Sequence, residues 1–363
     1  VNFIDTPGYN EFHGEVRAAL RACDGMLMVL SSTSGVETDT VRAWDYAVEL
    51  QMPRMAFINK MDVDGADFFG TIERMRELFG KGIMPLQIPI GEGANFEGVV
   101  DVAKMTAFTY KDGQPTEIAV PAHLIEKAQE IREMTVEAAA EGSDELLEKY
   151  LEGEELSLEE IRQGLREGMI SGRVCPIMCG SATSRIGLDQ VLDRMIRYMP
   201  DATKKVMTAT DAETGEQCVV HVDKPLTAFV FKTLLDPFAG KQSFVRIFSG
   251  ELKEGDRLYD VNQGVEEKWG KMVTLIGKQQ IPVSAAKAGD IVVIPKLANA
   301  KTGDTLTAPD FKVTYDAIRF PQPLYTVALE PVKKGEEEKL AGAVLKVAEE
   351  DPTCVVVKNA EAR

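Results

Sequence analysis

The segment Asp5-Thr6-Pro7-Gly8 combines groups that suit a phosphate and its metal ion. It follows the apolar run of residues 1–4, which predicts a short strand, and ligands of α/β proteins bind just beyond the carboxyl ends of parallel strands. The Asp5 carboxylate is a hard oxygen ligand for Mg²⁺, directly or through water. Pro7 fixes φ and Gly8 frees the backbone, so the Gly8 amide can approach a terminal phosphate closely. The segment alone also fits an ordinary turn after a strand.

A second polar segment, Asn59-Lys60-Met61-Asp62, follows another apolar run. The Asp62 carboxylate presents two acceptors in one plane, which match the ring N–H and the exocyclic amine of guanine; adenine offers no such pair. Asn59 can bridge the base and neighbouring loops, and the Lys60 stem can lie over the purine ring. A polar loop after a strand is common, but N-K-x-D downstream of a strand-terminal D-x-x-G is much rarer.

A third segment, Gly180-Ser181-Ala182, ends the apolar run of residues 174–179. Its small residues let backbone amides approach the edge of a base. We therefore predict that Asp5 to Gly8, Asn59 to Asp62 and Ser181-Ala182 are three walls of one guanine-nucleotide site. The prediction rests on the combination, because each segment alone has simpler explanations.

The elements that must position these segments alternate between strands and helices. Helical spacing over residues 12–23 is followed by an apolar strand at 25–30, a helix with Val41, Trp44 and Val48 on its inner stripe, and a strand at 55–58. This order predicts a doubly wound parallel sheet, whose strands are buried on both faces. A helix with an apolar face of Leu188, Val191, Leu192, Met195, Ile196 and Met199 follows the third segment.

Composition limits the class of protein. The 363 residues include 41 Lys and Arg against 58 Asp and Glu, and the net charge of -17 argues against a diffuse basic nucleic-acid surface. No apolar run is long enough to cross a bilayer. Five cysteines without zinc-type spacing predict buried free thiols in a reducing cytoplasm.

Residues 65–173 separate the second and third segments, and we interpret them as an inserted subdomain. Residues 84–102 have a β-like pattern, and the chain is helical from 124 onward. Leu156-Ser157-Leu158-Glu159-Glu160 predicts a capping box and a hydrophobic staple at a helix start. Between Glu126 and Glu167 there are 14 acidic and 5 basic residues, a net of -9, which is typical of a solvated helix face.

The remainder divides into three parts. Residues 201–224 are a linker with a small hairpin at Glu213-Thr214-Gly215-Glu216, and 225–310 have the short apolar runs and glycine turns of a small closed β-barrel. Residues 321–363 begin a ferredoxin-like βαβ unit, with a strand at 325–330, a helix, and a second strand after Asp351-Pro352 that extends to Lys358.

With these segments the chain resembles the translational GTPases, and specifically elongation factor G, over nearly its whole length. The resemblance extends to Asp236-Pro237-Phe238-Ala239-Gly240, Ser249-Gly250-Glu251-Leu252, Ala288-Gly289-Asp290-Ile291 and Thr302-Gly303-Asp304-Thr305-Leu306 in the β-rich part. It implies a P-loop-type GTPase domain (1–64 and 174–200, incomplete) with an inserted α+β subdomain, an all-β barrel, and a partial ferredoxin-like βαβ segment.

The resemblance also implies a function: binding and hydrolysis of GTP on the ribosome, which promotes translocation in the cytoplasm. Asp5 and Gly8 would hold Mg²⁺ and sense the γ-phosphate, with Thr6 and Pro7 in the same turn. Asn59, Lys60 and Asp62 would read guanine, and Ser181 and Ala182 would support the base. The implied ligands are GTP, GDP and Mg²⁺. The implied partners are ribosomal RNA and proteins, including the stalk protein through the insertion. The chain itself would be a monomer that does not bind a membrane.

Two departures from the family qualify these expectations. The family's P-loop and first switch are expected before Val1, so we predict that this chain binds GTP weakly or not at all. Tyr9 occupies the position of the family's catalytic histidine. A tyrosine is a poor proton acceptor at neutral pH, since its ordinary pKa is ~10. His13, one helical turn on, could in principle substitute for the missing imidazole, but we interpret it as a surface residue of the helix. An alternative therefore stays open: a ribosome-associated GTP-binding paralogue with slow or altered hydrolysis, acting as a binding switch.

Overall fold

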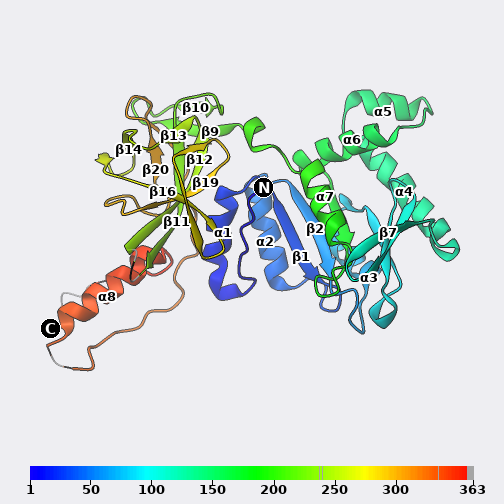
Figure 1. Ribbon diagram of the computed structural model, residues 1–363, viewed down its shortest axis with the longest axis horizontal. Helices are drawn as coiled ribbons and strands as arrows, with labels where there is room; N and C mark the ends of the chain where they lie inside the picture. Colours follow the sequence, from blue (N-terminus) through cyan, green and yellow to red (C-terminus); the bar gives the residue numbers. More distant parts are fainter. Residues whose placement is uncertain (237, 239, 334, 358–363) are drawn as a thin grey trace. The chain divides into compact units, whose positions relative to one another are not determined.

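The computed structural model describes residues 1–236, 238, 240–333 and 335–357 (Figure 1). By their internal contacts the residues form two compact units. One unit is Asp24–Pro200, and the other combines Val1–Cys23 with Asp201–Arg363. The domain boundaries expected from the sequence stay predictions, and the first 23 residues group with the later part of the chain.

A four-stranded parallel sheet is the centre of the unit Asp24–Pro200. Its strand order is β1 (Met26–Ser31), β2 (Arg54–Asn59), β8 (Cys175–Cys179) and β3 (Ile83–Pro85). β2 and β8 are almost entirely buried, as expected for parallel strands with both faces covered. The three strands predicted at 25–30, 55–58 and 174–179 are confirmed, and they lie side by side.

Three helices follow strands of this sheet: α2 (Thr38–Glu49), α3 (Phe68–Phe79) and α7 (Leu188–Tyr198). In α2 the buried residues are Trp44 and Ala47, whereas Val48, predicted on the inner stripe, is 48% exposed. The Trp44 ring stacks on Phe79, with centroids 4.2 Å apart, so Trp44 and Ala47, not Val48, mark the buried face of the helix.

The apolar face predicted for α7 is wrong in part. Leu192 and Ile196 are 49% and 70% exposed, while Arg194 and Tyr198 are buried. Arg194 forms a buried ion pair with Asp101, and this partner lies within the segment predicted as an insertion. A buried cation held by a carboxylate therefore sets the inner face of α7, which an apolar pattern cannot reveal.

The segment predicted as an insertion contains a second, antiparallel sheet and three helices. The sheet runs β4 (Gln87–Ile90), β5 (Gly98–Asp101), β6 (Thr106–Lys111) and β7 (Gln114–Ile118). The helices are α4 (Ile125–Ala140), α5 (Asp144–Leu151) and α6 (Leu158–Ile170), which lie together in Figure 1. β3 also falls in this segment but pairs with β8 of the parallel sheet.

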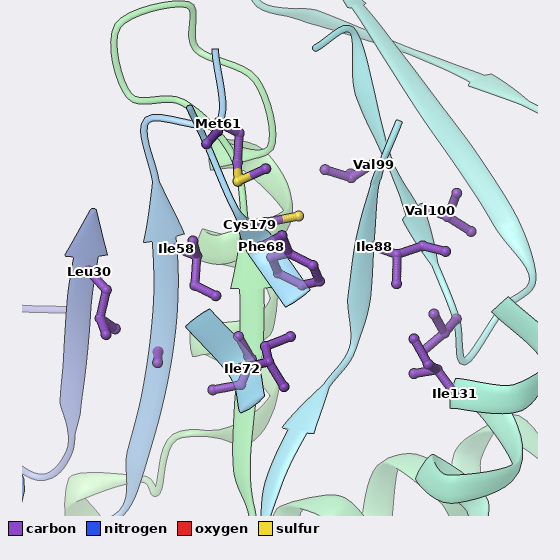
Figure 2. Packing of buried hydrophobic residues seen from close by; sticks show 14 of the residues in the cluster. Leu30, Ile58, Met61, Phe68, Ile72, Ile88, Val99, Val100, Ile131 and Cys179 are labelled. Atoms are coloured by element: carbon purple, nitrogen blue, oxygen red, sulfur yellow. The ribbon is translucent and has the colours of Figure 1, made fainter. Parts of the chain in front are cut away.

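One hydrophobic core joins the parallel sheet to the antiparallel one (Figure 2). Leu30, Ile58 and Cys179 from β1, β2 and β8 belong to the same buried cluster as Ile88 of β4 and Val99 of β5. The two sheets therefore fold as one packed body, because their apolar faces bury each other from water.

The capping box predicted at the start of α6 is confirmed. The Ser157 backbone N–H donates to Glu160 Oε2 at 2.7 Å, and the Glu160 backbone N–H donates to Ser157 Oγ at 3.3 Å. Leu156 and Ile161, which flank these residues, are buried in the same apolar cluster, as a hydrophobic staple requires.

The second unit is rich in β-structure, as predicted for residues 225–310. An eight-stranded antiparallel sheet has the order β15 (Val265–Glu267), β14 (Leu258–Asp260), β20 (Thr305–Thr307), β11 (Thr227–Asp236), β12 (Gly240–Ser249), β19 (Ile291–Pro295), β16 (Met272–Ile276) and β17 (Gln279–Val283). β13 (Glu251–Lys253) pairs with β18 (Ala285–Lys287) in a separate sheet. Among the described strands no pair joins β15 to β17, so full closure of a barrel stays a prediction. Pro237 and Ala239, quoted for the resemblance, lie outside the described residues.

The hairpin predicted at residues 213–216 is present. β9 (Met207–Asp211) and β10 (Gln217–Val220) are antiparallel, and Asp211 Oδ1 accepts from the backbone N–H groups of Glu213 and Thr214, both at 2.9 Å. β21 (Val313–Thr314) adds to β9, so the segment predicted as a linker is part of a three-stranded sheet.

Residues 1–8 do not form the predicted strand. A strand needs a neighbour for its backbone hydrogen bonds, and β1 of the parallel sheet pairs only with β2 among the described strands. The helical spacing after Tyr9 is confirmed: a 3-10 turn at Asn10–Phe12 leads into α1 (His13–Ala22).

His13 is buried, at 6% exposure, so its interpretation as a surface residue is wrong. The beginning of α1 is covered by residues distant in sequence, since a methyl group at Gly14 would lie 2.8 Å from Thr353 Cγ2 and 3.6 Å from Phe320 Cδ1. A single helical pattern cannot show which late segment of the chain packs on it.

Of the βαβ unit expected after residue 321, the helix is found as α8 (Glu337–Glu350). The strand predicted at 325–330 is absent from the described residues, and residues 353–357 of the second predicted strand are not extended in a sheet. Tyr325 and Val327 are 85% and 61% exposed, which is consistent with the lack of a neighbouring strand to pair with. Lys358 lies outside the described residues.

All five cysteines are free thiols, as predicted, but only Cys175 and Cys179 are buried, and Cys354 is exposed. Burial raises the pKa of Cys175 to about 12. In the described part of the chain, none of the helices has the length and apolar character needed to cross a membrane.

Candidate functional site

The second and third polar segments meet at one edge of the parallel sheet. β2 and β8 are neighbours in parallel register, with Ile58 opposite Cys179. Both strands therefore end at the same level, and the loops that follow them begin side by side. Two distant segments thus share one place in the fold, although 123 positions of sequence separate Asn59 from Ala182.

Asn59 joins these two loops through its side chain. Its Oδ1 accepts from the backbone N–H of Lys60 at 2.8 Å and from that of Ala182 at 2.9 Å. A second link is the backbone N–H of Met61, which donates to the carbonyl of Gly180 at 3.2 Å. These bonds fix the spacing between the loops.

Lys60 stands in the left-handed region, with φ of 65°. This conformation is unfavourable for a residue with a side chain, and such residues persist where the surroundings hold them. The carbonyl of Lys60 accepts from Ser32 Oγ at 2.8 Å, and the Ser32 backbone N–H donates to the carbonyl of Asn59 at 2.9 Å. Buried Ser32, just after β1, therefore holds the turn.

Asp62 is held as an ionised acceptor by the loop after β8. Its Oδ2 accepts from Ser184 Oγ. Partial burial raises the pKa of Asp62, but hydrogen bonds from Ser184, Ser181 and its own backbone N–H outweigh this effect, so the pKa lies below its ordinary value. Asp62 is therefore a carboxylate at neutral pH, as recognition of two N–H donors requires.

The loop after β8 is closed on itself. Ser181 and Ile186 exchange two backbone hydrogen bonds, both 3.0 Å, and Ser184 donates through its backbone N–H to Ser181 Oγ at 3.2 Å. Gly180 is needed at the start, because a Cβ there would lie 2.3 Å from the carbonyl oxygen of Ile186 and 3.0 Å from the ring of Phe57. Ser181 is buried, while Ala182 is exposed at the sheet edge.

Asp5, Thr6, Pro7 and Gly8 belong to the other compact unit. Asp5 and Gly8 are exposed, and a Cβ on Gly8 would meet nothing within 4 Å, so the backbone is open to approach. Tyr9 is 75% exposed and its carbonyl accepts from the Phe12 backbone N–H at 3.0 Å. Within the described residues, no three His, Cys, Asp or Glu side chains gather as metal ligands. The union of all three segments in one site stays a prediction.

Two residues of this edge were not predicted from the sequence: Ser32 and Ser184. Ser32 directly follows β1, a strand of the same parallel sheet as the one that carries Asn59. Ser184 lies three residues after Ser181, a spacing that is compatible with a serine closing its own loop. Both contribute hydroxyl groups that hold backbone or carboxylate oxygens.

Comparison with known proteins shows the family to which this chain belongs. Residues 1–201 match the family model of the elongation factor Tu GTP binding domain. The chain therefore belongs to the family of GTPases that carry the elongation factor Tu GTP-binding domain.

Two further matches define the kind of factor. Residues 225–309 match elongation factor G domain 2, and residues 320–363 match elongation factor G domain III. A crystal structure of a protein from Thermus thermophilus is similar, with a TM-score of 0.85 and 33% sequence identity over 98% of this chain and 51% of that one. The chain is thus elongation-factor-G-like, and it spans about half the length of the matched structure.

Proposed function

We propose that the protein is a translational GTPase of the elongation factor G type, which binds and hydrolyses GTP on the ribosome and promotes translocation. The observation that carries the proposal is the linked edge of β2 and β8, where Asn59 joins two loops and Asp62 stays ionised. The three family matches along the chain support the same assignment.

Guanine recognition follows from the chemistry of this edge. The Asp62 carboxylate accepts from the ring N–H and the exocyclic amine of the base, and adenine leaves it without those donors. The Lys60 stem covers the purine ring, and the Ser181-Ala182 loop supports the base edge through backbone N–H groups. The bonds from Asn59 and Ser184 hold these parts in place before the nucleotide binds.

The phosphate end of the nucleotide is assigned to the segment from Asp5 to Gly8. One exposed carboxylate with an adjacent hydroxyl fits Mg²⁺, because this ion retains several waters and is held by few protein oxygens together with phosphates. When bound, Mg²⁺ would neutralise charge on the phosphates. Asp5 would orient its water shell, and the open backbone of Gly8 would sense the γ-phosphate.

We assign hydrolysis to a longer protein that contains this chain, called the intact parent below, when that protein is bound to the ribosome. Phosphoryl transfer depends on positioning and electrostatics, so the Tyr9 hydroxyl would orient the attacking water without acting as a strong base. The insertion, with its acidic helices, is the surface proposed for the ribosomal stalk protein. The parent is proposed to be a cytoplasmic monomer.

Single-turnover hydrolysis of GTP by the intact parent, with and without ribosomes, tests this proposal. Stimulation by ribosomes that is lost in Tyr9→Phe supports a positioning role for the hydroxyl. Equal stimulation in both proteins removes Tyr9 from the mechanism, and no ribosome-dependent turnover at all argues against a GTPase of this type.

A second candidate function rests on Tyr9 as well. A hydroxyl in place of the family's histidine favours a ribosome-associated paralogue in which nucleotide occupancy acts as the switch and hydrolysis is slow. In that case ribosome binding would differ between the GTP and GDP forms, while single-turnover rates would hardly rise with ribosomes.

A further inference from the structure

The insertion contacts both loops of the proposed base site. The backbone N–H of Gly93, in the 3-10 turn Gly93–Asn95 of the insertion, donates to the carbonyl of Met61 at 2.9 Å. The β6–β7 turn meets the other loop, since a Cβ on Gly113 would lie 3.1 Å from Arg185 Cβ. The strands of the insertion share one core with β2 and β8 (Figure 2).

The most specific of these contacts comes from Tyr110 at the end of β6. Its hydroxyl donates to Asp189 Oδ1 at 2.7 Å, across 79 positions of sequence. Asp189 is in the first turn of α7, directly after the loop that carries Ser181 and Ala182. The loop and the helix meet at Gly187, whose left-handed backbone has φ of 81° and provides no side-chain cap for α7. The bond from Tyr110 is therefore a side-chain contact that ties the start of α7 to β6, beside the bond from Gln190 Nε2 to Asp189 Oδ2 at 3.0 Å.

The Tyr110 hydroxyl stays protonated in its contact with the Asp189 carboxylate, so it can donate this hydrogen bond throughout the physiological pH range. Burial and the Asp189 carboxylate hold the pKa of Tyr110 well above its ordinary value, against a smaller opposite effect from the Gly187 backbone. The hydroxyl is thus a permanent donor at every physiological pH. Further along the same helix, Arg194 is buried against Asp101 at the other end of the β5–β6 hairpin. The hairpin therefore holds α7 at two points.

We propose that Tyr110 is a positioning residue for guanine recognition. By holding Asp189 it fixes the start of α7, and with it the Ser181-Ala182 loop and the Ser184 hydroxyl that orients Asp62. This inference rests on the proposed function, because it names a residue of the insertion as part of the specificity of that site. The base preference of the protein then depends on the insertion and not only on the loops that touch the base.

Two measurements on Tyr110→Phe test the proposal, with Tyr150→Phe on α5 as a control for the same chemical change. The first is hydrogen exchange of the nucleotide-free chain. Loss of the bond is expected to raise exchange of residues 181–191 several-fold in Tyr110→Phe, and to leave it unchanged in Tyr150→Phe. Equal exchange in wild type and Tyr110→Phe overturns the proposal, whatever the protein binds.

The second measurement is the ratio of GDP to ADP affinity in the intact parent. ADP shares the ribose and phosphates of GDP but lacks the paired donors that Asp62 accepts. We expect GDP affinity to fall about 5- to 10-fold in Tyr110→Phe while ADP affinity changes less than about twofold, in line with the net loss of one ordinary hydrogen bond.

The outcomes separate this inference from the proposed function. A wild-type protein that does not prefer GDP to ADP argues against the guanine site itself. A wild-type preference for GDP that is unchanged in Tyr110→Phe, or a fall in both affinities by the same factor, overturns the positioning role alone.

Discussion

The Oδ1 atom of Asn59 accepts a hydrogen bond from the backbone N–H of Ala182 at 2.9 Å, across 123 positions of sequence. The same atom accepts from the backbone N–H of Lys60 at 2.8 Å. One side chain thus determines the distance between the loop that would read guanine and the loop that would support it.

Asn59→Ala removes the acceptor of both N–H groups. We expect GDP affinity of the intact parent to fall about tenfold, the equivalent of about 1.4 kcal/mol, because the two loops lose a shared bond. Isothermal calorimetry measures the change. Asn95→Ala, an exposed asparagine in the insertion, is the matched control. Equal affinities for wild type and Asn59→Ala would show that the loops keep their spacing without this side chain.

Ser184→Ala removes the hydroxyl that donates to Asp62. The pKa of Asp62 is depressed in the folded protein, so ionised Asp62 contributes stability above its ordinary pKa, and this contribution is lost as pH falls through the depressed value. We expect the pKa of Asp62 to rise in Ser184→Ala. The carboxyl ¹³C chemical shift of Asp62, recorded over an acid titration, measures this pKa. Thr183→Ala, at the exposed neighbouring position, should leave the titration unchanged. A pKa that stays depressed in Ser184→Ala would assign the effect to Ser181 and the backbone.

Arg194→Ala leaves Asp101 buried without its cation. The side chains of the pair are 4% and 1% exposed, so we expect a loss of about 3–5 kcal/mol in the free energy of unfolding of the unit that contains them. Chemical denaturation followed by far-UV circular dichroism measures it. Arg197→Ala is the control on the same helix: its pair with Asp193 is exposed and is worth less than about 1 kcal/mol. Similar losses in both variants would contradict the buried pair.

Asp260 gives the β-rich unit a dependence on pH. Burial, with the nearby carboxylates of Asp304 and Glu267, raises the pKa of Asp260 to about 7 from an ordinary value of 3.8, while the backbone N–H of Gln263 opposes this effect. The folded state therefore holds a proton that the unfolded chain releases at lower pH. The resulting stability is complete below the ordinary pKa and is lost as pH rises through about 7.

In the wild-type protein the Gln263 backbone N–H donates to Asp260 Oδ1 at 3.0 Å. Asp260→Asn removes the titrating group and keeps an oxygen that can accept this bond. Between pH 5 and pH 8, hydrogen exchange of β14 and β20 should rise with pH more steeply in wild type than in the variant, after correction for the intrinsic rate. The difference is at most about 1.4 kcal/mol per pH unit. Parallel profiles for the two proteins would show that Asp260 is ionised throughout this range.

Local patterns in the sequence were sufficient for the three predicted strands of the parallel sheet, for the helices and for the capping box. Apolar runs of strand length identified β1, β2 and β8, because a buried parallel strand has to be apolar on both faces. The box at Ser157 and Glu160 was readable because its bonds span only three residues. Polar segments at the ends of these strands led to Asn59, Asp62 and Ser181.

Tertiary structure decided which of these features meet and which face is buried. No local pattern shows that Asn59 reaches Ala182, that Arg194 turns inward toward Asp101, or that His13 is covered. The strand predicted at residues 1–4 failed for the same reason, since a strand exists only where another strand supplies its hydrogen bonds. The sequence by itself determined the chemical groups and the elements that carry them. Only packing between distant segments decided their partners, because those contacts depend on the whole core.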